Sequence, residues 1–165
     1  MSGLYLFAVI GATRVAISTG EIEAVVKLGS LAPVPGSPRH VAGLATLRSR
    51  VLTIIDAAML ITGRGCCSQN CSGKSGCHAI VCDISGHSYG ILVDGLEDIE
   101  QVDTPCHPVC GRLDPAWHPY VRGTLEHDGH PYMVLSIAGF IESPAVIAPA
   151  APGRCGPAGA GCCPA

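Results

Sequence analysis

The chain has 165 residues and a formal net charge of −3, with 48% hydrophobic and only 14% charged residues. Such a chain can bury a core, but it lacks the basic field that would hold a phosphate backbone, which argues against a nucleic-acid-binding protein. It has neither an apolar run of the roughly 20 residues that span a bilayer nor the basic start of a signal peptide, so we expect a soluble cytoplasmic protein.

The N-terminal segment predicts a β-hairpin. Residues 4–10 are largely apolar and read as a strand, the turn begins at Gly11, and residues 15–18 form the returning strand. A further apolar segment follows over residues 22–26. The chain therefore opens with strands rather than helices.

A proline-rich stretch leads to a second predicted hairpin. At Ser37 and Pro38 we expect a short helical turn, with Ser37 as N-cap and Pro38 at the first helical position. Residues 44–47 and 51–55 then read as two strands around a turn at residues 48–50, because β-branched residues concentrate in the second arm.

Two short helices are predicted after capping residues. Asp56 precedes a run of good helix formers at residues 57–60, and Ser136 holds the corresponding place before residues 137–141. Although one residue is charged and the other is neutral, both can accept a hydrogen bond from the first turn of a helix.

The chain contains an internal repeat. Residues 4–25 resemble residues 79–99, and residues 41–56 resemble residues 121–136. The aligned pairs are Leu6 with Val81, Gly11 with Gly86, Ile17 with Leu92 and Gly20 with Gly95 in the first comparison, and Val41 with Val121 and Gly43 with Gly123 in the second. Glycines in register with apolar alternation indicate a duplicated β unit, hence two packed modules with a seam where partners can bind.

The chain has 10 cysteines but no export signal to suggest a disulfide framework. They gather in two loops and the tail, except Cys82, which lies in a strand pattern. The candidate metal ligands are Cys66, Cys67, Cys71, Cys77, Cys106 and Cys110. These suffice in number for a zinc site but lack Cys-x-x-Cys spacing, so a zinc site and incidental surface thiols both remain open. We predict no other cofactor.

Motifs of catalysis are missing from the sequence. Neither His-Glu-x-x-His nor Gly-x-Ser-x-Gly occurs, and the pattern pairs no nucleophile with a base. The clustered acids Glu97, Asp98 and Glu100 are typical of solvated turn charges. We therefore predict no catalytic residue, and a small enzyme with a site in the cleft between the modules is the weaker alternative.

The segment from Val41 to Asp56 resembles the signature of the CheW family of chemotaxis coupling proteins. In that pattern a hydrophobic-x-Gly is followed by Arg-Gly-x-hydrophobic and by an apolar run that ends in Asp. Gly43, Arg48 and Asp56 fit it, while Ser49 stands where the family usually has glycine. A turn that needs positive φ at Ser49 would be strained.

Later segments extend the resemblance. Residues 89–99 and 120–123 are similar to family segments of the second half, so the resemblance covers roughly residues 4–142. It implies an all-β fold of two small five-stranded SH3-like β-barrels, related by pseudo-symmetry around a shared apolar core, with short helical turns.

We expect one CheW-like domain over residues 1–142. Subdomain 1 is expected at about residues 1–62 plus a closing C-terminal segment, and subdomain 2 at about residues 78–142, with a cysteine-rich loop at 63–77 between them. Residues 143–165 are rich in Ala, Pro, Gly and Cys, so we expect a disordered tail.

The resemblance implies a non-enzymatic adaptor that couples the cytoplasmic tips of chemoreceptors to the regulatory domain of the histidine kinase CheA, in the cytoplasm at membrane receptor arrays. By position, Ile22, Gly43 and Arg48 match receptor-binding residues of the family, while the kinase-binding residues are not assigned. The residues alone favour the simpler interpretation, in which Arg48 is a solvated turn residue, Gly43 a bend requirement and Ile22 ordinary core. The main alternative is a thiol- or metal-sensing adaptor on the same double barrel.

Overall fold

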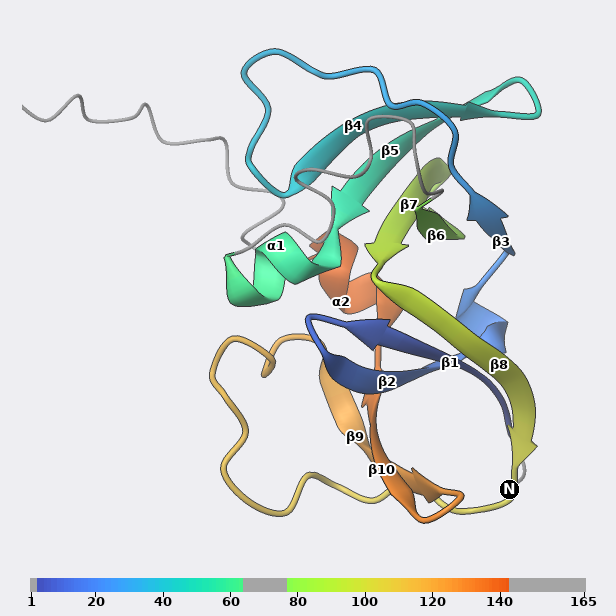
Figure 1. Cartoon of the computed structure of the whole chain (residues 1–165), viewed down its shortest axis with the longest axis vertical. Helices are drawn as coiled ribbons and strands as arrows, with labels where there is room; N and C mark the ends of the chain where they lie inside the picture. Colours follow the sequence, from blue (N-terminus) through green and yellow to red (C-terminus); the bar gives the residue numbers. More distant parts are fainter. Residues whose placement is uncertain (1–2, 64–76, 143–165) are drawn as a thin grey trace, which may run out of the picture.

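The computed structural model describes residues 3–63 and 77–142, and within them ten strands form two five-stranded sheets (Figure 1). The first half contains β1 (Gly3–Ile10), β2 (Thr13–Ser18), the 3-10 helix η1 (Thr19–Glu21), β3 (Ala24–Lys27), β4 (Val41–Leu47), β5 (Arg50–Asp56) and α1 (Ala57–Thr62). The second half contains β6 (His78–Ile84), β7 (His87–Val93), β8 (Gly95–Val102), β9 (Val121–His127), β10 (His130–Leu135) and α2 (Ile137–Glu142). The predicted all-β class is confirmed.

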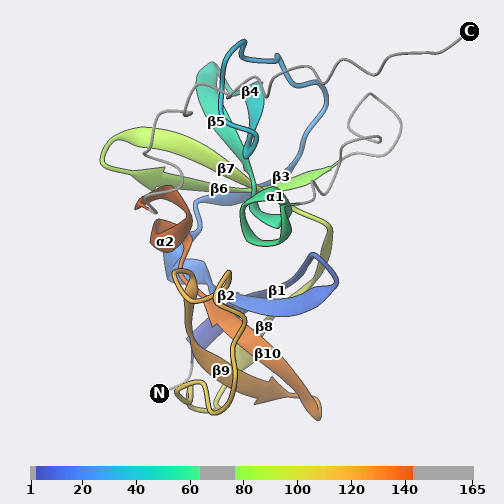
Figure 2. The ribbon, with the colours of Figure 1, turned by 90° about the vertical axis from the view of Figure 1, so that its left-hand side faces the viewer.

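Each sheet combines strands from both halves of the chain (Figure 2). Sheet A has the order β8-β1-β2-β10-β9, and sheet B has the order β3-β6-β7-β5-β4. The opening hairpin of each half thus shares a sheet with three strands of the other half, through the parallel pairs β2–β10 and β7–β5 and the antiparallel pairs β1–β8 and β6–β3. The two sheets are therefore interleaved in sequence, whereas the expectation was subdomain 1 at about residues 1–62 plus a closing C-terminal segment and subdomain 2 at about 78–142.

Each sheet curls around its own interior, and we call the two units barrel A and barrel B. Among the described residues, the two edge strands of each sheet do not pair with each other through backbone hydrogen bonds, so each barrel has an open seam. The seam of barrel A lies between β8 and β9, and that of barrel B lies between β3 and β4. The hairpins β4–β5 and β9–β10 lie at opposite ends of the molecule (Figure 1).

The alternation of side chains along each strand divides the apolar residues among three cores. On β1, Leu6 and Ala8 face a central core between the sheets, whereas Phe7 faces the interior of barrel A. On β6, Ile80 likewise faces the central core and Val81 the interior of barrel B. The central core also receives α1 and α2, so it joins both halves of the chain.

The structure corrects the register of the first repeat. The turn residues Gly11 and Ala12 occupy the same place as Ser85 and Gly86, because Ile10 pairs with Thr13 where Ile84 pairs with His87. Leu6 therefore corresponds to Ile80, and the sequence alignment of Leu6 with Val81 was wrong by one residue. A slip of one residue places aligned side chains on opposite faces of a sheet.

The second repeat is confirmed in register. Val41 pairs with Ile55 and Gly43 with Ile54, after an irregularity in the ladder. The other hairpin has the same irregularity, because Val121 pairs with Leu135 and Gly123 with Val134. The two closing hairpins are thus equivalent residue by residue.

Capping is as expected for α1 and different for α2. The N–H of Met59 donates to Asp56 Oδ1 at 3.0 Å, which confirms Asp56 as the N-cap. At the start of α2, the N–H of Ile137 donates to Glu21 Oε2 at 2.7 Å, whereas Ser136 Oγ accepts from Arg122 Nη2 at 3.0 Å. The acceptor found there thus comes from η1 in the other half of the chain. Of the helices in the described residues, none has the length and apolar character to cross a membrane.

The helical turn expected at Ser37 and Pro38 is reduced to one hydrogen-bonded turn, which Ser37 does not cap. The N–H of Val41 donates to Pro38 O at 3.0 Å, which closes a single turn directly before β4. Ser37 Oγ donates backward to Val34 O at 2.8 Å and caps nothing. The predicted capping role of Ser37 was wrong, and because β4 begins to pair with β5 at Val41, the chain makes only this single turn before the strand.

Candidate partner-binding surface

The turn between β4 and β5 carries Arg48 at its tip. Arg48 and Ser49 are its two central residues, and both have left-handed backbone conformations with φ of 46° and 69°. This type of hairpin turn favours Asn and Gly, so the strain expected at Ser49 is present. Arg48 is exposed and makes no ion pair or side-chain hydrogen bond with the described part of the chain. Its planar set of donors is therefore available to a partner.

A pocket of about 400 Å³ lies beside this turn, at the open seam of barrel B. It reaches from the edge strand β3 to the β4–β5 hairpin, and both apolar and charged side chains line it. The lining residues are Glu23, Ala24, Val25, Val26, Leu47, Arg48, Arg50, Leu52, Val81 and Ser88. Below, this is called the seam pocket.

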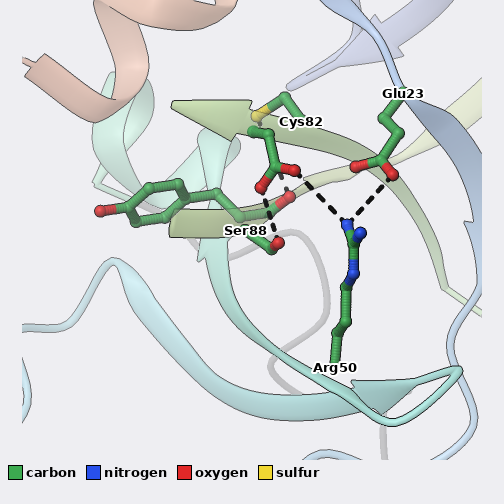
Figure 3. Close-up of polar contacts among 6 residues, drawn as sticks. Glu23, Arg50, Cys82 and Ser88 are labelled. Carbon is green, nitrogen blue, oxygen red and sulfur yellow. Dashed lines mark hydrogen bonds and ion pairs between the residues drawn. The ribbon is translucent and has the colours of Figure 1, made fainter. Parts of the chain in front are cut away.

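Two carboxylates hold Arg50 at the pocket. Its Nη1 lies 3.3 Å from Glu23 Oε1 and 3.4 Å from Asp83 Oδ2, and Ser88 Oγ donates to Asp83 Oδ1 at 2.7 Å (Figure 3). These charged side chains are about half exposed, so water screens the pairs and they add little to stability. They do offset the charge of Arg50, which leaves Arg48 as the cation without a counter-charge among the described residues that line the pocket.

Gly43 has a role within the chain. It is buried, its φ is 148°, and a Cβ built there would lie 2.6 Å from Ala32 O. Ala32 and Leu44 exchange backbone hydrogen bonds of 2.8 Å at this point, so glycine lets the chain's own backbone approach β4. The same arrangement recurs at Gly123, where an added Cβ would lie 2.5 Å from His107 O. A bend requirement therefore accounts for Gly43 without a partner.

Ile22 lies between η1 and β3. It is half-buried and packs against the central core, and its backbone N–H donates to Thr19 O at 3.1 Å. The next residue, Glu23, lines the seam pocket. Of the three residues predicted to bind a receptor, only Arg48 is thus exposed, and their role in binding stays a prediction.

The predicted metal ligands fall into three groups. Cys66, Cys67 and Cys71 lie outside the described residues, as do most of the cysteine-rich loop and the whole predicted tail. Cys77 is disulfide-bonded, and a disulfide sulfur is not the thiolate that zinc requires. Cys106 and Cys110 are free and exposed. In the described ranges, no cluster of three metal-ligating side chains is suitably placed, and the zinc site remains a prediction.

Cys82 is the buried thiol that the strand pattern indicated. Burial, together with the negative charges of Asp83, Glu21 and Glu23, raises the pKa of Cys82 to about 12. Its Sγ lies 3.9 Å from Tyr89 O, a contact drawn in Figure 3. The thiol therefore stays protonated near neutral pH and has the character of a small apolar side chain.

Sequence reasoning missed His40, which directly precedes β4. The side chain is only 8% exposed, and its buried Nε2 has no hydrogen-bond partner within residues 3–63 and 77–142. Burial lowers the pKa of His40 below its ordinary value of 6.5. Tyr120 holds the equivalent place in the second half, where it stacks on Phe140 with ring centroids 4.4 Å apart. The aligned repeat, which places His40 opposite the aromatic Tyr120, was the signal that could have indicated a buried histidine at this position.

Sequence reasoning also missed the seam pocket, although the side chains along β3 alternate between two faces and some of them line the pocket. Ala24 and Val26 lie on the face that packs against the barrel B core, and Glu23 lies at the surface directly before them. Neither the apolar face of β3 nor the exposed Glu23 identifies a pocket, because the sequence does not show that β3 and β4 leave an open seam between them.

Comparisons with known proteins agree with this architecture. A family model described as CheW-like domain matches residues 4–145. Among solved structures, the crystal structure of the scaffolding protein TtCheW from Thermoanaerobacter tengcongensis superimposes with a TM-score of 0.70 at 18% sequence identity, covering 88% of this chain and 96% of that chain. A likeness at this identity shows the fold. No curated protein matches the chain.

Proposed function

The chain belongs to the CheW-like domain family, and we propose that it is a chemotaxis adaptor that joins chemoreceptor tips to the histidine kinase CheA and catalyses no reaction itself. The observation that carries this proposal is the family match over residues 4–145, which takes in both sheets. The adaptor would act in the cytoplasm, at arrays of membrane receptors.

An adaptor transmits a signal by holding two partners at a fixed spacing, so it needs a stiff body with separate surfaces. The shared central core supports this requirement, since it joins strands and helices from both halves of the chain. The hairpins β4–β5 and β9–β10, which end in Arg48 and Asp128, reach to opposite ends of the molecule (Figure 1). In this proposal, each end would meet a different protein.

For the receptor surface we propose Arg48 as the direct contact. Gly43 would act by shaping the hairpin that carries Arg48, since glycine permits the pairing of β4 with the segment at Ala32. Ile22 would act by anchoring the approach to β3 on the central core. The kinase surface is not assigned to particular residues.

The receptor contact is tested by a pull-down with a receptor-tip fragment. Arg48→Glu should weaken capture at least about fivefold, because it replaces the donors with a repelling carboxylate, while the melting temperature stays nearly unchanged. Arg112→Glu, at another exposed arginine, is the matched control and should bind as the wild type does. Equal capture by both variants, or equal loss of binding and stability in Arg48→Glu, would contradict a contact at Arg48.

A further inference from the structure

The two barrels differ at their open seams. In barrel A, the Nε2–H of His127 at the end of β9 donates to Glu100 Oε2 on β8 at 2.8 Å. Since β8 and β9 are the edge strands of sheet A, this hydrogen bond links the two sides of the seam. The side chain of His127 is only 19% exposed, so it lies within the seam.

Three aromatic rings fill the seam of barrel A. The ring of His127 stacks on Phe7, with centroids 4.9 Å apart and planes 13° from parallel. Phe7 in turn meets Tyr132 edge to face at 4.5 Å. Phe7 and Tyr132 are 2% and 7% exposed, so these rings close the interior of the barrel.

Barrel B has aliphatic side chains at the equivalent positions. The strand pairing establishes which positions are equivalent. At the hairpins, Leu47 pairs with Arg50 as His127 pairs with His130. At the edge strands, Val26 pairs with Ala79 as Glu100 pairs with Tyr5. The equivalent pairs are His127 and Leu47, Tyr132 and Leu52, Phe7 and Val81, and Glu100 and Val26. All four barrel B residues line the seam pocket. The pocket is therefore the space that three rings and a carboxylate occupy in barrel A.

The charge at the seam is also reversed. Asp128 is the turn residue of the β9–β10 hairpin, and Arg48 is its equivalent in barrel B. Arg50 is already paired with Glu23 and Asp83. An occupant of the seam pocket thus meets the apolar side chains of the lining and the guanidinium of Arg48, which has no counter-charge among the described residues that line the pocket.

We propose that the seam pocket binds an aromatic side chain with a neighbouring carboxylate, presented by a protein partner of this adaptor. The ring would take the place that His127 fills in barrel A, and the carboxylate would meet Arg48 as an anion. A side chain can enter because the pocket opens between β3 and the β4–β5 hairpin. Only the choice of a protein as the source rests on the proposed function, since the chemistry of the pocket follows from the two barrels.

The pocket is tested first with small probes on the full-length chain, by methyl and amide NMR. N-acetyl-L-phenylalanine should shift the signals of Val26, Leu47, Leu52 and Val81 saturably, at millimolar concentrations as expected for so small a ligand. N-acetyl-L-phenylalaninamide, which lacks the carboxylate, should bind about threefold to fivefold more weakly. N-acetyl-L-alanine should leave these signals unchanged. Shifts that fail to saturate, or that scatter over the surface, would overturn the pocket.

Variants then test the comparison between the barrels. The double substitution Val26→Glu with Leu47→His copies the link of barrel A and should abolish the response to N-acetyl-L-phenylalanine. Val51→His, which adds a histidine at a side chain that is 62% exposed and outside the pocket lining, should leave the response unchanged. Arg48→Gln should keep ring binding but lose the preference for the acid over the amide. Unaltered binding in the double variant, with its fold verified by melting, would contradict the inference.

The source of the ring is tested separately by pull-down with the receptor-tip fragment and the CheA regulatory domain. We expect the double variant to lose at least one of these partners, with Val51→His as the control. Binding of the small probe combined with full capture of both partners would overturn the assignment to a protein side chain. Absence of probe binding with normal capture would overturn the pocket alone and leave the adaptor function standing.

Discussion

Glu21 and Arg122 form an ion pair between the two halves of the chain, with Nη1 and Oε1 2.8 Å apart. Glu21 lies in η1 of the first half, and Arg122 lies on β9 of the second. The same carboxylate accepts the N–H of Ile137 at 2.7 Å, so it also fixes the start of α2. One side chain thus holds a strand and a helix of the second half against the first.

Removal of this carboxylate should destabilise the fold. Glu21 is only 22% exposed, so Glu21→Ala should lower the free energy of unfolding by about 1–2 kcal/mol, through loss of a charge-assisted hydrogen bond at a helix start. Glu23→Ala removes a carboxylate that is 46% exposed and should cost less than about 0.5 kcal/mol. Urea denaturation of both variants checks this. An equal or larger cost for Glu23→Ala would refute the role given to Glu21.

Ser49→Gly should stabilise the protein. The φ of 69° at Ser49 is unfavourable for a residue with a Cβ, and glycine removes that strain at the cost of some added freedom in the unfolded chain. We expect a gain of about 0.5–1 kcal/mol in the free energy of unfolding. Ser18→Gly, at a φ of −62°, serves as the control and should bring no gain. Thermal melting of the three proteins decides the matter, and a loss of stability in Ser49→Gly would show that the turn is not strained there.

Gly43→Ala should destabilise the fold by at least about 2 kcal/mol, because the new Cβ would meet Ala32 O at 2.6 Å in a backbone conformation that disfavours side chains. Gly29→Ala is the matched control, since nothing lies within 4 Å of a Cβ built there. It should change stability by less than about 0.5 kcal/mol. If Gly43→Ala lost receptor binding and kept its stability, Gly43 would be a direct partner contact instead.

Acid should destabilise the protein through His40. Its pKa in the folded chain is lowered from 6.5 by burial, so the unfolded chain binds the proton more readily. The stability that comes from keeping this imidazole neutral is present above pH 6.5 and is lost as the pH falls through the lowered pKa. His40→Tyr, which copies the residue at position 120, should reduce the loss of stability between pH 7.5 and pH 5.5.

The exposed His87 provides the control for this titration. His87→Tyr should retain the full acid dependence of the wild type in urea denaturation at the same pH values. Identical pH dependence in the wild type and in His40→Tyr would show that another group causes the acid sensitivity.

Local features of the fold could be read from the sequence where short-range chemistry decides them. Asp56 before a run of helix formers predicted the start of α1, because a cap needs only its own first turn. The register of the first repeat could not be read, because glycine takes the first turn position at Gly11 and the second at Gly86. Matching these letters shifted the alignment by one residue and exchanged the faces of β6.

Long-range features were beyond the sequence for a different reason. The exchange of hairpins between sheets depends on the parallel pairing of β2 with β10 and of β7 with β5, which no local pattern encodes. To recognise that the seam pocket takes the place of rings in barrel A, one must compare Leu47 with His127 and Val81 with Phe7. The second comparison requires the corrected register of the first repeat. Arg48 was predicted as a receptor contact because the resemblance to a family covers its turn, whereas no such signal pointed to the pocket beside it.

The most direct test of the adaptor function is a three-component capture. A tagged CheA regulatory domain should retain a receptor-tip fragment only when this chain is present, in near-equal amounts of all three proteins, and the fragment should be lost when Arg48→Glu replaces the wild-type chain. Two results would contradict an adaptor that holds both partners at once: capture of the receptor-tip fragment in the absence of this chain, or competition between the fragment and the CheA regulatory domain for binding to this chain.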